Sequence, residues 1–305
     1  YYLYCIMKGS GTIGSNTGNL VRYDVEDGSV ETFDCLHDLN DKEISHISYN
    51  PATESLLLVY ATGNVDLIDN DGDVHNITAL KDNSIMGESV YGIGHYGEKV
   101  FICTDRGIIE LDAYEAVVRE TYHLSGIKPY SFAEIDEMFY VATNHGLFKF
   151  SAISNMHDKS VWDTPISEEV YVELAVHDSH LFGRKENGVD EISLNGRALN
   201  ILQNTVTYMD SDDGCLVFGN SSHVFIYNDE YTSRWNNVNF KLPKSTKDIT
   251  YIKGKFYVAE GLEGISCYDL QDKQFVNSEP LFHLDSPRRD LFYHITFVGD
   301  RLLSA

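Results

Sequence analysis

The sequence predicts an all-β fold: a single β-propeller of seven four-stranded blades, closed by pairing of its N- and C-terminal strands. Three observations lead to this prediction. Short apolar runs recur along the chain, each followed by a polar turn and a strand in which apolar and acidic residues alternate. The turns recur about every 40–45 residues, a typical length for a propeller blade. Tyr and Phe, which favour half-buried pleated surfaces, number 20 and 15.

The repeating unit is clearest at residues 55–69, where the sequence is SLLLVYATGNVDLID. An apolar run enters a turn that contains glycine, and an alternating strand follows. A strand also precedes each apolar run, so each unit holds about four strands. The other copies of the pattern are at residues 99–112, 138–150, 180–192, 215–229 and 255–269, and residues 17–24 match its second half.

The turn between the second and third strands gives the register of the repeat. Primed hairpin turns need positive φ angles, which glycine adopts most readily. Successive turn positions are 45, 44, 39, 42, 34 and 42 residues apart, at Gly18, Gly63, Gly107, Gly146, Gly188, Ser222 and Gly264. The rival fold, two stacked β-sandwiches, predicts no such period.

The two ends of the chain are expected to complete one blade together. The first unit lacks an innermost strand, because the opening YYLYCIMKG has the character of a second strand. The tail sequence HITFV, residues 294–298, is expected to supply it. We therefore predict one domain over residues 1–305, with eight blades as the alternative, and the surplus RLLSA suggests that the protein continues into another module. The expected blades are near residues 1–40, 41–80, 88–125, 129–165, 168–203, 205–240 and 246–280, with closing strands at 290–305.

Two segments require a choice between helix and strand. Residues 112–124 have some helical spacing, but their place in the repeat favours strand, turn and strand. Residues 151–160, SAISNMHDKS, are the best candidate for a short helical turn.

Charge and cysteine content exclude several functions. Asp and Glu number 47 against 23 Lys and Arg, giving a net charge of −24, which would repel nucleic acid and anionic membranes. No apolar run approaches the ~20 residues that cross a bilayer. The cysteines are odd in number and widely spaced, so we expect buried thiols rather than disulfides or a zinc site. They are Cys5, Cys35, Cys103, Cys215 and Cys267.

No sequence pattern identifies a metal site, a cofactor or a catalytic site, and we predict none of the three. The stretch DNDGDVHN, residues 69–76, alternates Asp residues, but Val74 stands where a calcium loop needs glycine, so a hairpin turn is favoured. The stretches DSDDG at 210–214 and HDSH at 177–180 are likewise interpreted as turns. The glycine-rich GSGTIG, residues 9–14, is interpreted as a loop, and G-x-S-x-G is absent.

The candidate contact residues follow from the position of the turns. In a propeller, the turns between second and third strands lie on one face, where a rigid scaffold can present binding residues. The candidates for partner contact are Asp105, Arg106, Asn144, His145, Lys185, Glu186, Asn220, Glu260 and Glu263.

Residues 40–82, with GIGHYGEKVFICTDRGIIELD, MFYVATNHGLFKF and the tail FYHITFVGDRLLSA, resemble the N-terminal propellers of the PorZ-like family of Bacteroidota. That family is associated with type IX secretion and carries propeller repeats of the two-component-regulator type. The resemblance implies export to the periplasm or cell surface. It also implies a second propeller and a small C-terminal β-domain beyond this segment, and no catalysis.

Together these features predict a non-enzymatic, exported propeller that serves as an interaction platform in the cell envelope. Its expected partner is a protein or a glycan. Two alternatives stay open: the ligand-sensing periplasmic domain of a hybrid two-component regulator, and a polysaccharide-active propeller enzyme. The enzyme would need paired carboxylates or a metal, which a single sequence does not bring together.

Overall fold

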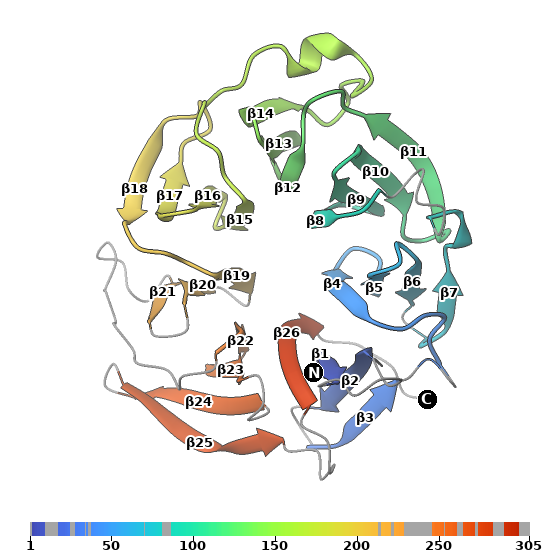
Figure 1. The fold of residues 1–305 in the computed structure, drawn as a ribbon. Helices are drawn as coiled ribbons and strands as arrows, with labels where there is room; N and C mark the ends of the chain where they lie inside the picture. The colour runs from blue at the N-terminus through green and yellow to red at the C-terminus, as the bar shows by residue number, and fades with distance from the viewer. Residues whose placement is uncertain are drawn as a thin grey trace. The chain divides into compact units, whose positions relative to one another are not determined.

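The computed structural model describes residues 2–9, 18–24, 28–33, 35, 38–69, 71–80, 87–212, 215–220, 223–228, 246–252, 254–260, 265–271, 274–282 and 290–298. The chain divides into two compact units, one formed by residues 1–76 and 207–305 and the other by residues 77–206. Each unit consists of antiparallel sheets in which consecutive strands are neighbours, except that β26 pairs with β1 (Figure 1). The fold is therefore all-β and propeller-like, as the repeat predicts.

The unit of residues 77–206 holds three sheets, with strand orders β11-β10-β9-β8, β12-β13-β14 and β15-β16-β17-β18. Two short 3-10 helices, η1 (Thr78–Leu80) and η2 (Lys159–Trp162), lie outside the sheets. The strands are β8 (Val90–Tyr96), β9 (Lys99–Thr104), β10 (Gly107–Asp112), β11 (Val117–His123), β12 (Pro129–Ile135), β13 (Met138–Thr143), β14 (Gly146–Ser151), β15 (Glu173–His177), β16 (His180–Lys185), β17 (Gly188–Ile192) and β18 (Ala198–Leu202).

The other unit holds four sheets, with strand orders β26-β1-β2-β3, β4-β5-β6-β7, β19-β20-β21 and β22-β23-β24-β25. Its strands are β1 (Tyr2–Gly9), β2 (Gly18–Asp24), β3 (Val30–Phe33), β4 (Ile44–Asn50), β5 (Ser55–Tyr60), β6 (Val65–Ile68), β7 (Val74–Asn76), β19 (Tyr208–Asp212), β20 (Cys215–Gly219), β21 (Val224–Asn228), β22 (Asp248–Ile252), β23 (Lys255–Ala259), β24 (Ile265–Gln271), β25 (Gln274–Phe282) and β26 (Asp290–Val298).

One sheet joins the two ends of the chain. Strand β1 pairs antiparallel with β26, in a register that sets Tyr2 opposite Val298 and Gly9 opposite Asp290. The tail thus supplies the innermost strand that the first unit of the repeat lacks, as the sequence predicts. The seven-bladed count, the closure of a complete ring and the single-domain boundaries stay predictions.

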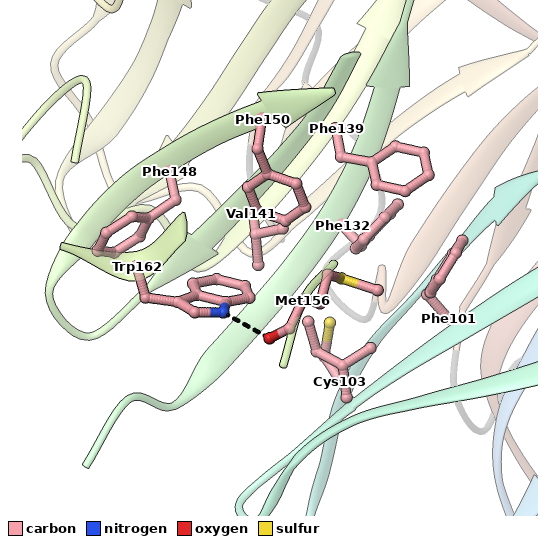
Figure 2. Close-up of a cluster of buried hydrophobic side chains, with 10 residues drawn as sticks. Phe101, Cys103, Phe132, Phe139, Val141, Phe148, Phe150, Met156 and Trp162 are labelled. Carbon is pink, nitrogen blue, oxygen red and sulfur yellow. Dashed lines mark hydrogen bonds between the residues drawn. The ribbon is translucent and has the colours of Figure 1, made fainter. Parts of the chain in front are cut away.

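Aromatic side chains seal neighbouring sheets against each other in the unit of residues 77–206. Figure 2 shows one such cluster, in which Phe101 of β9 and Phe132 of β12 lie beside Phe139 of β13. Trp162 of η2 closes the cluster and donates from Nε1 to the carbonyl oxygen of Met156 at 3.0 Å. Burial of each such side chain stabilises the fold by about 1.5–3 kcal/mol. A single sheet would leave these faces exposed, so the repeat is stable only when its neighbours pack on it.

The helical turn overlaps residues 151–160, where the sequence places it, only at Lys159 and Ser160. Ser151 ends β14, and the 3-10 helix starts only at Lys159 and ends at Trp162. Its start is set by Asp158, whose side chain accepts a hydrogen bond from the backbone N–H of Ser160 at 2.9 Å. Residues 112–124, in contrast, form the predicted strand, turn and strand. Among the described residues, no helix has the length and apolar character needed to span a bilayer.

Candidate functional site

The candidate site is the set of turns that join the second and third strands of each sheet in the unit of residues 77–206. Strands β8 and β12 run in the same direction, because Gly92 and Gly94 lie directly against the backbone of Tyr130 and Phe132. A Cβ at Gly92 would lie 2.5 Å from the carbonyl oxygen of Tyr130, so glycine permits this close approach. The second-to-third-strand turns of these two sheets therefore lie at the same end.

A shared hydrogen-bond pattern builds these turns. Thr104 donates from Oγ1 to the carbonyl oxygen of Gly107 at 3.1 Å, and its Oγ1 accepts from the N–H of Arg106 at 3.2 Å. Thr143 and Gly146 repeat the first bond at 2.9 Å. Gly107 and Gly146 have φ angles of 137° and 108°, which L side chains rarely adopt. The glycine register predicted from the sequence is therefore confirmed at both turns.

Two of the predicted contact residues anchor the chain within its own unit. Asp105 accepts at Oδ1 from the N–H groups of Glu88 and Ser89, at 3.0 and 3.2 Å. Asn144 accepts at Oδ1 from the N–H of Lys128 at 2.6 Å and donates from Nδ2 to the carbonyl oxygen of Gly126 at 3.2 Å. Both side chains hold the segment that enters the innermost strand. Their polar groups therefore form hydrogen bonds that stabilise the fold.

Lys185 is a third anchor, because it neutralises a buried carboxylate. Its Nζ lies 2.7 Å from Oδ2 of Asp190, which is 1% exposed, and 3.3 Å from Oε2 of Glu169. Asp190 also accepts from Tyr171 Oη at 3.0 Å and from Asn200 Nδ2 at 2.7 Å. Partial burial acts to lower the pKa of Lys185, but the hydrogen bonds and charges of the two carboxylates outweigh it and raise the pKa.

Three predicted residues project from the turns as exposed side chains: Arg106, His145 and Glu186. We call these three residues the turn tips. Within the described part of the chain, no carboxylate forms an ion pair with the Arg106 guanidinium. The ring of His145 stays close to its own turn, with Nε2 lying 3.1 Å from the carbonyl oxygen of Gly126. The turn tips combine a cation, an imidazole and an anion, a set suited to recognition.

The remaining three predicted residues belong to the other unit. Asn220 closes its own turn, because its Oδ1 accepts from the N–H of His223 at 3.1 Å. Glu260 is buried, at 4% exposure, and accepts at Oε1 from Tyr268 Oη at 2.6 Å. Glu263 lies outside the described residues. Of the contact residues predicted in this unit, Asn220 thus bonds within its own turn and Glu260 is a buried carboxylate.

Sequence reasoning missed an aromatic pair beside the turns. Tyr91 and Tyr130 follow Val90 and Pro129 near the start of β8 and β12, where the pairing with the second strand is interrupted by a bulge in each sheet. Their rings are half-buried and meet edge to face, with centroids 5.4 Å apart and planes at 84°. Bulges commonly re-aim side chains at the rims of sheets. The sequence carries a signal for this pair, because a tyrosine that follows Val or Pro recurs at the start of successive units. These dipeptides are Val-Tyr at 90–91, Pro-Tyr at 129–130 and Val-Tyr at 170–171.

Two of the stretches considered as metal sites form turns, whereas the stretch 210–214 begins in β19 and its last two residues lie outside the described residues. Asp69 accepts at Oδ1 from the N–H groups of Asp71 and Asp73, at 2.9 and 3.0 Å. The stretch 177–180 joins β15 to β16 through Asp178 and Ser179, whose φ angles are 48° and 60°. Over the described residues, no group of three His, Cys, Asp or Glu side chains is arranged to hold a metal ion.

The thiols that the structure describes are buried or half-buried. Cys103, Cys215 and Cys267 are buried and Cys35 is half-buried, and none of the four forms a disulfide. Burial raises the pKa of the Cys103 thiol, so that group is unreactive in the folded state. The side chain of Cys5 lies outside the described residues.

The fold and the turn geometry together define a propeller-type scaffold of antiparallel sheets. Residues 15–163 match the family described as the type IX secretion PorZ N-terminal beta-propeller domain. The resemblance predicted from the sequence is thereby confirmed over that part of the chain. The comparison with curated protein sequences finds no match.

Solved structures extend the fold similarity over most of the chain. PorZ of Porphyromonas gingivalis, a surface component of the type IX secretion system, superposes with a TM-score of 0.75 at 20% identity, over 90% of this chain and 38% of PorZ. The computationally designed Ika8 protein superposes with a TM-score of 0.59 at 11% identity, over 90% of this chain and 87% of Ika8. BamB of Moraxella catarrhalis gives 0.50 at 15% identity, over 85% and 78%. This chain thus spans about two fifths of the length of PorZ.

Proposed function

We propose that this chain is a non-enzymatic interaction module of an exported, type IX secretion-associated protein at the cell envelope. The supporting observation is the set of turn tips, exposed side chains on turns that are otherwise anchored by their own hydrogen bonds. A scaffold of this kind presents its side chains on a backbone that is already ordered, so the backbone loses little conformational entropy on binding. The match of residues 15–163 to the PorZ propeller family supports the association with secretion.

The chemistry of the turn tips and of the neighbouring tyrosine pair favours a protein partner. Arg106 can form a bidentate pair with a carboxylate, and Arg and Tyr are enriched where proteins recognise each other. The pair Tyr91 and Tyr130 adds apolar surface at the start of the innermost strands, close in register to the turns. A glycan that stacks on these rings is the alternative partner.

Site-specific photo-crosslinking tests this function in the full-length protein within the bacterium that produces it. A photoreactive residue at Arg106 or His145 is expected to form a crosslink to one discrete envelope protein. The matched control is Ile153, which is 95% exposed and follows the opposite end of β14. The double variant Arg106→Ala with His145→Ala is expected to lower secretion of type IX cargo at unchanged protein level. Equal crosslinking from all three positions, or unimpaired secretion, would contradict the proposal.

A further inference from the structure

Strand β18 is the last strand of its sheet, and within the described part of its own unit no further strand pairs with its outer edge (Figure 1). Its sequence, ALNIL, contains no charged residue, and Leu199 is 61% exposed. Edge strands usually carry charges that prevent another chain from pairing with them. The outer strand β11 follows that rule, since it holds Arg119 and Glu120. Strand β18 lacks this protection.

A hollow of about 560 Å³ opens beside the first residues of β18. Ile192, Leu194 and Leu199 give it an apolar wall, and Leu194 is 44% exposed. The hollow lies by the β15–β16 and β17–β18 turns, so it is at the opposite end of its sheet from Glu186. It is therefore separate from the turn tip of the same sheet.

The wall of the hollow is held in place by neighbouring segments. Lys149 of β14 donates from Nζ to the carbonyl oxygen of Leu194 at 2.7 Å. Gly196 has a φ of 87°, and a Cβ there would lie 2.1 Å from the carbonyl oxygen of Ile166. The turn from Ser193 to Arg197 is thus fixed before any ligand arrives.

The hairpin geometry leaves backbone groups of β18 at the outer edge. The N–H of Ser193 donates to the carbonyl oxygen of Arg197 at 2.9 Å, and Glu191 is opposite Leu199 in the register. In an antiparallel pair, hydrogen-bonded positions alternate along each strand. Leu199 therefore bonds inward to β17, and the N–H and C=O groups of Ala198 and Asn200 face outward.

Charge indicates the chemistry of the occupant. Glu191 lines the hollow, and its Oε1 lies 3.9 Å from Nε2 of His180, beyond hydrogen-bond distance. The chain as a whole carries a net charge of −24, which attracts basic segments and repels a second copy of itself. Arg197 lies at the turn end of the hollow, so an incoming cation fits on the Glu191 side.

We propose that β18 accepts an extended segment of a partner protein as a fifth strand of its sheet. An apolar side chain of the segment fills the hollow against Leu194 and Leu199, and a Lys or Arg two positions away, on the same face, pairs with Glu191. Main-chain hydrogen bonds to Ala198 and Asn200 supply affinity, and the hollow supplies sequence preference. This site is independent of the turn tips.

A random twelve-residue peptide library displayed on phage, selected on the purified chain, provides the probe. Enriched peptides are expected to carry an apolar residue and a Lys or Arg two positions apart, because Glu191 is opposite Leu199 and lies on the same face of the sheet. Their affinity, measured by fluorescence anisotropy on a synthetic copy, is expected to fall at least tenfold in Ala198→Pro, which removes an outward N–H. Leu199→Lys places a charge on the edge and gives the same loss without altering the backbone. Glu191→Gln weakens binding several-fold.

Tyr114→Lys is the matched control, because it adds the same charge at a residue that is 78% exposed in the turn between β10 and β11 of a different sheet. It is expected to bind the peptide as the unaltered chain does. The proposal is overturned if no peptide is selected, if selected peptides bind Leu199→Lys undiminished, or if they require acidic residues. Sedimentation that shows a dimer dissociated by Leu199→Lys would instead assign the edge to a second copy of the chain.

Discussion

The rings of Phe101 and Phe132 stack across two consecutive sheets, with centroids 4.3 Å apart and planes inclined by 13°. Phe101 is 1% exposed and Phe132 is 3% exposed. Each ring is therefore shielded from water by the packing of the other sheet. Phe139 meets both rings, at 5.3 and 4.8 Å between centroids. Contacts of this kind, rather than bonds within a blade, hold successive repeats together.

Phe101→Ala is expected to reduce the free energy of unfolding by about 3–5 kcal/mol, because it removes a buried ring and leaves a cavity between two sheets. Urea titration followed by tyrosine fluorescence measures the change. Phe101→Leu keeps much of the volume and is expected to cost less than half as much. A loss below about 1 kcal/mol for the alanine variant would mean that the two sheets do not depend on this contact.

Much of the fold could be predicted because its signals are local. Alternation of apolar and acidic residues places β6 and β10, and the turn glycines fix the ends of neighbouring strands. The pairing of β26 with β1 was also predictable, because the first unit of the repeat lacks one strand and the C-terminal tail contains an additional strand. The error at residues 151–160 arose because the start of η2 depends on the cap formed by Asp158 and on burial of Trp162.

The site could be predicted only in part, because polarity in a turn does not distinguish an anchor from a free side chain. Asp105 and Arg106 are adjacent and both charged, yet the first bonds two backbone N–H groups and the second is exposed. Glu260 follows an apolar strand as a surface residue would, but the hydroxyl of Tyr268 holds it inside. Such outcomes depend on contacts between distant residues, which a single sequence does not reveal.

Gly146→Ala is expected to destabilise the protein by more than about 3 kcal/mol, since it combines strain at a φ of 108° with a Cβ only 2.2 Å from the carbonyl oxygen of Ser167. Gly97→Ala is the matched control. Gly97 has a φ of 57° and no atom within 4 Å of the added Cβ, so only the conformational cost of about 1 kcal/mol remains. Thermal unfolding of both variants measures the difference. Equal losses would show that the space beside Gly146 does not require glycine.

Asp112 is expected to make the protein less stable in acid. Burial acts to raise the pKa of this carboxyl, but hydrogen bonds from the N–H groups of Glu115 and Tyr114 and from Arg119 outweigh it, so the pKa lies below its ordinary 3.8. A group whose pKa is lowered by folding contributes stability above 3.8 that is lost as pH falls through the folded value.

Urea midpoints between about pH 5 and pH 2 measure this effect in the unaltered chain and in Asp112→Asn. The variant is expected to be less stable at the upper pH and to lose less stability on acidification. Arg119→Gln removes the ion pair and its hydrogen bonds to Asp112, and it is expected to cost less than Asp112→Asn because the cation is 51% exposed. Parallel pH curves for Asp112→Asn and the unaltered chain would contradict the assignment.

Lys185→Met is expected to destabilise the fold by about 3 kcal/mol, because it leaves the carboxylate of Asp190 buried without its cation. The second substitution, Asp190→Asn, removes the buried charge that has lost its cation. The double variant is therefore expected to regain part of the lost free energy of unfolding. Lys185→Arg keeps the cation and is expected to be nearly neutral. The raised pKa of Lys185 means that the contribution is present below the ordinary value of 10.5 and is lost only as pH rises through the higher folded value. Urea unfolding of these three variants and of Asp190→Asn alone, near neutral pH, measures the coupling, and strictly additive losses would exclude the ion pair as the link between these residues.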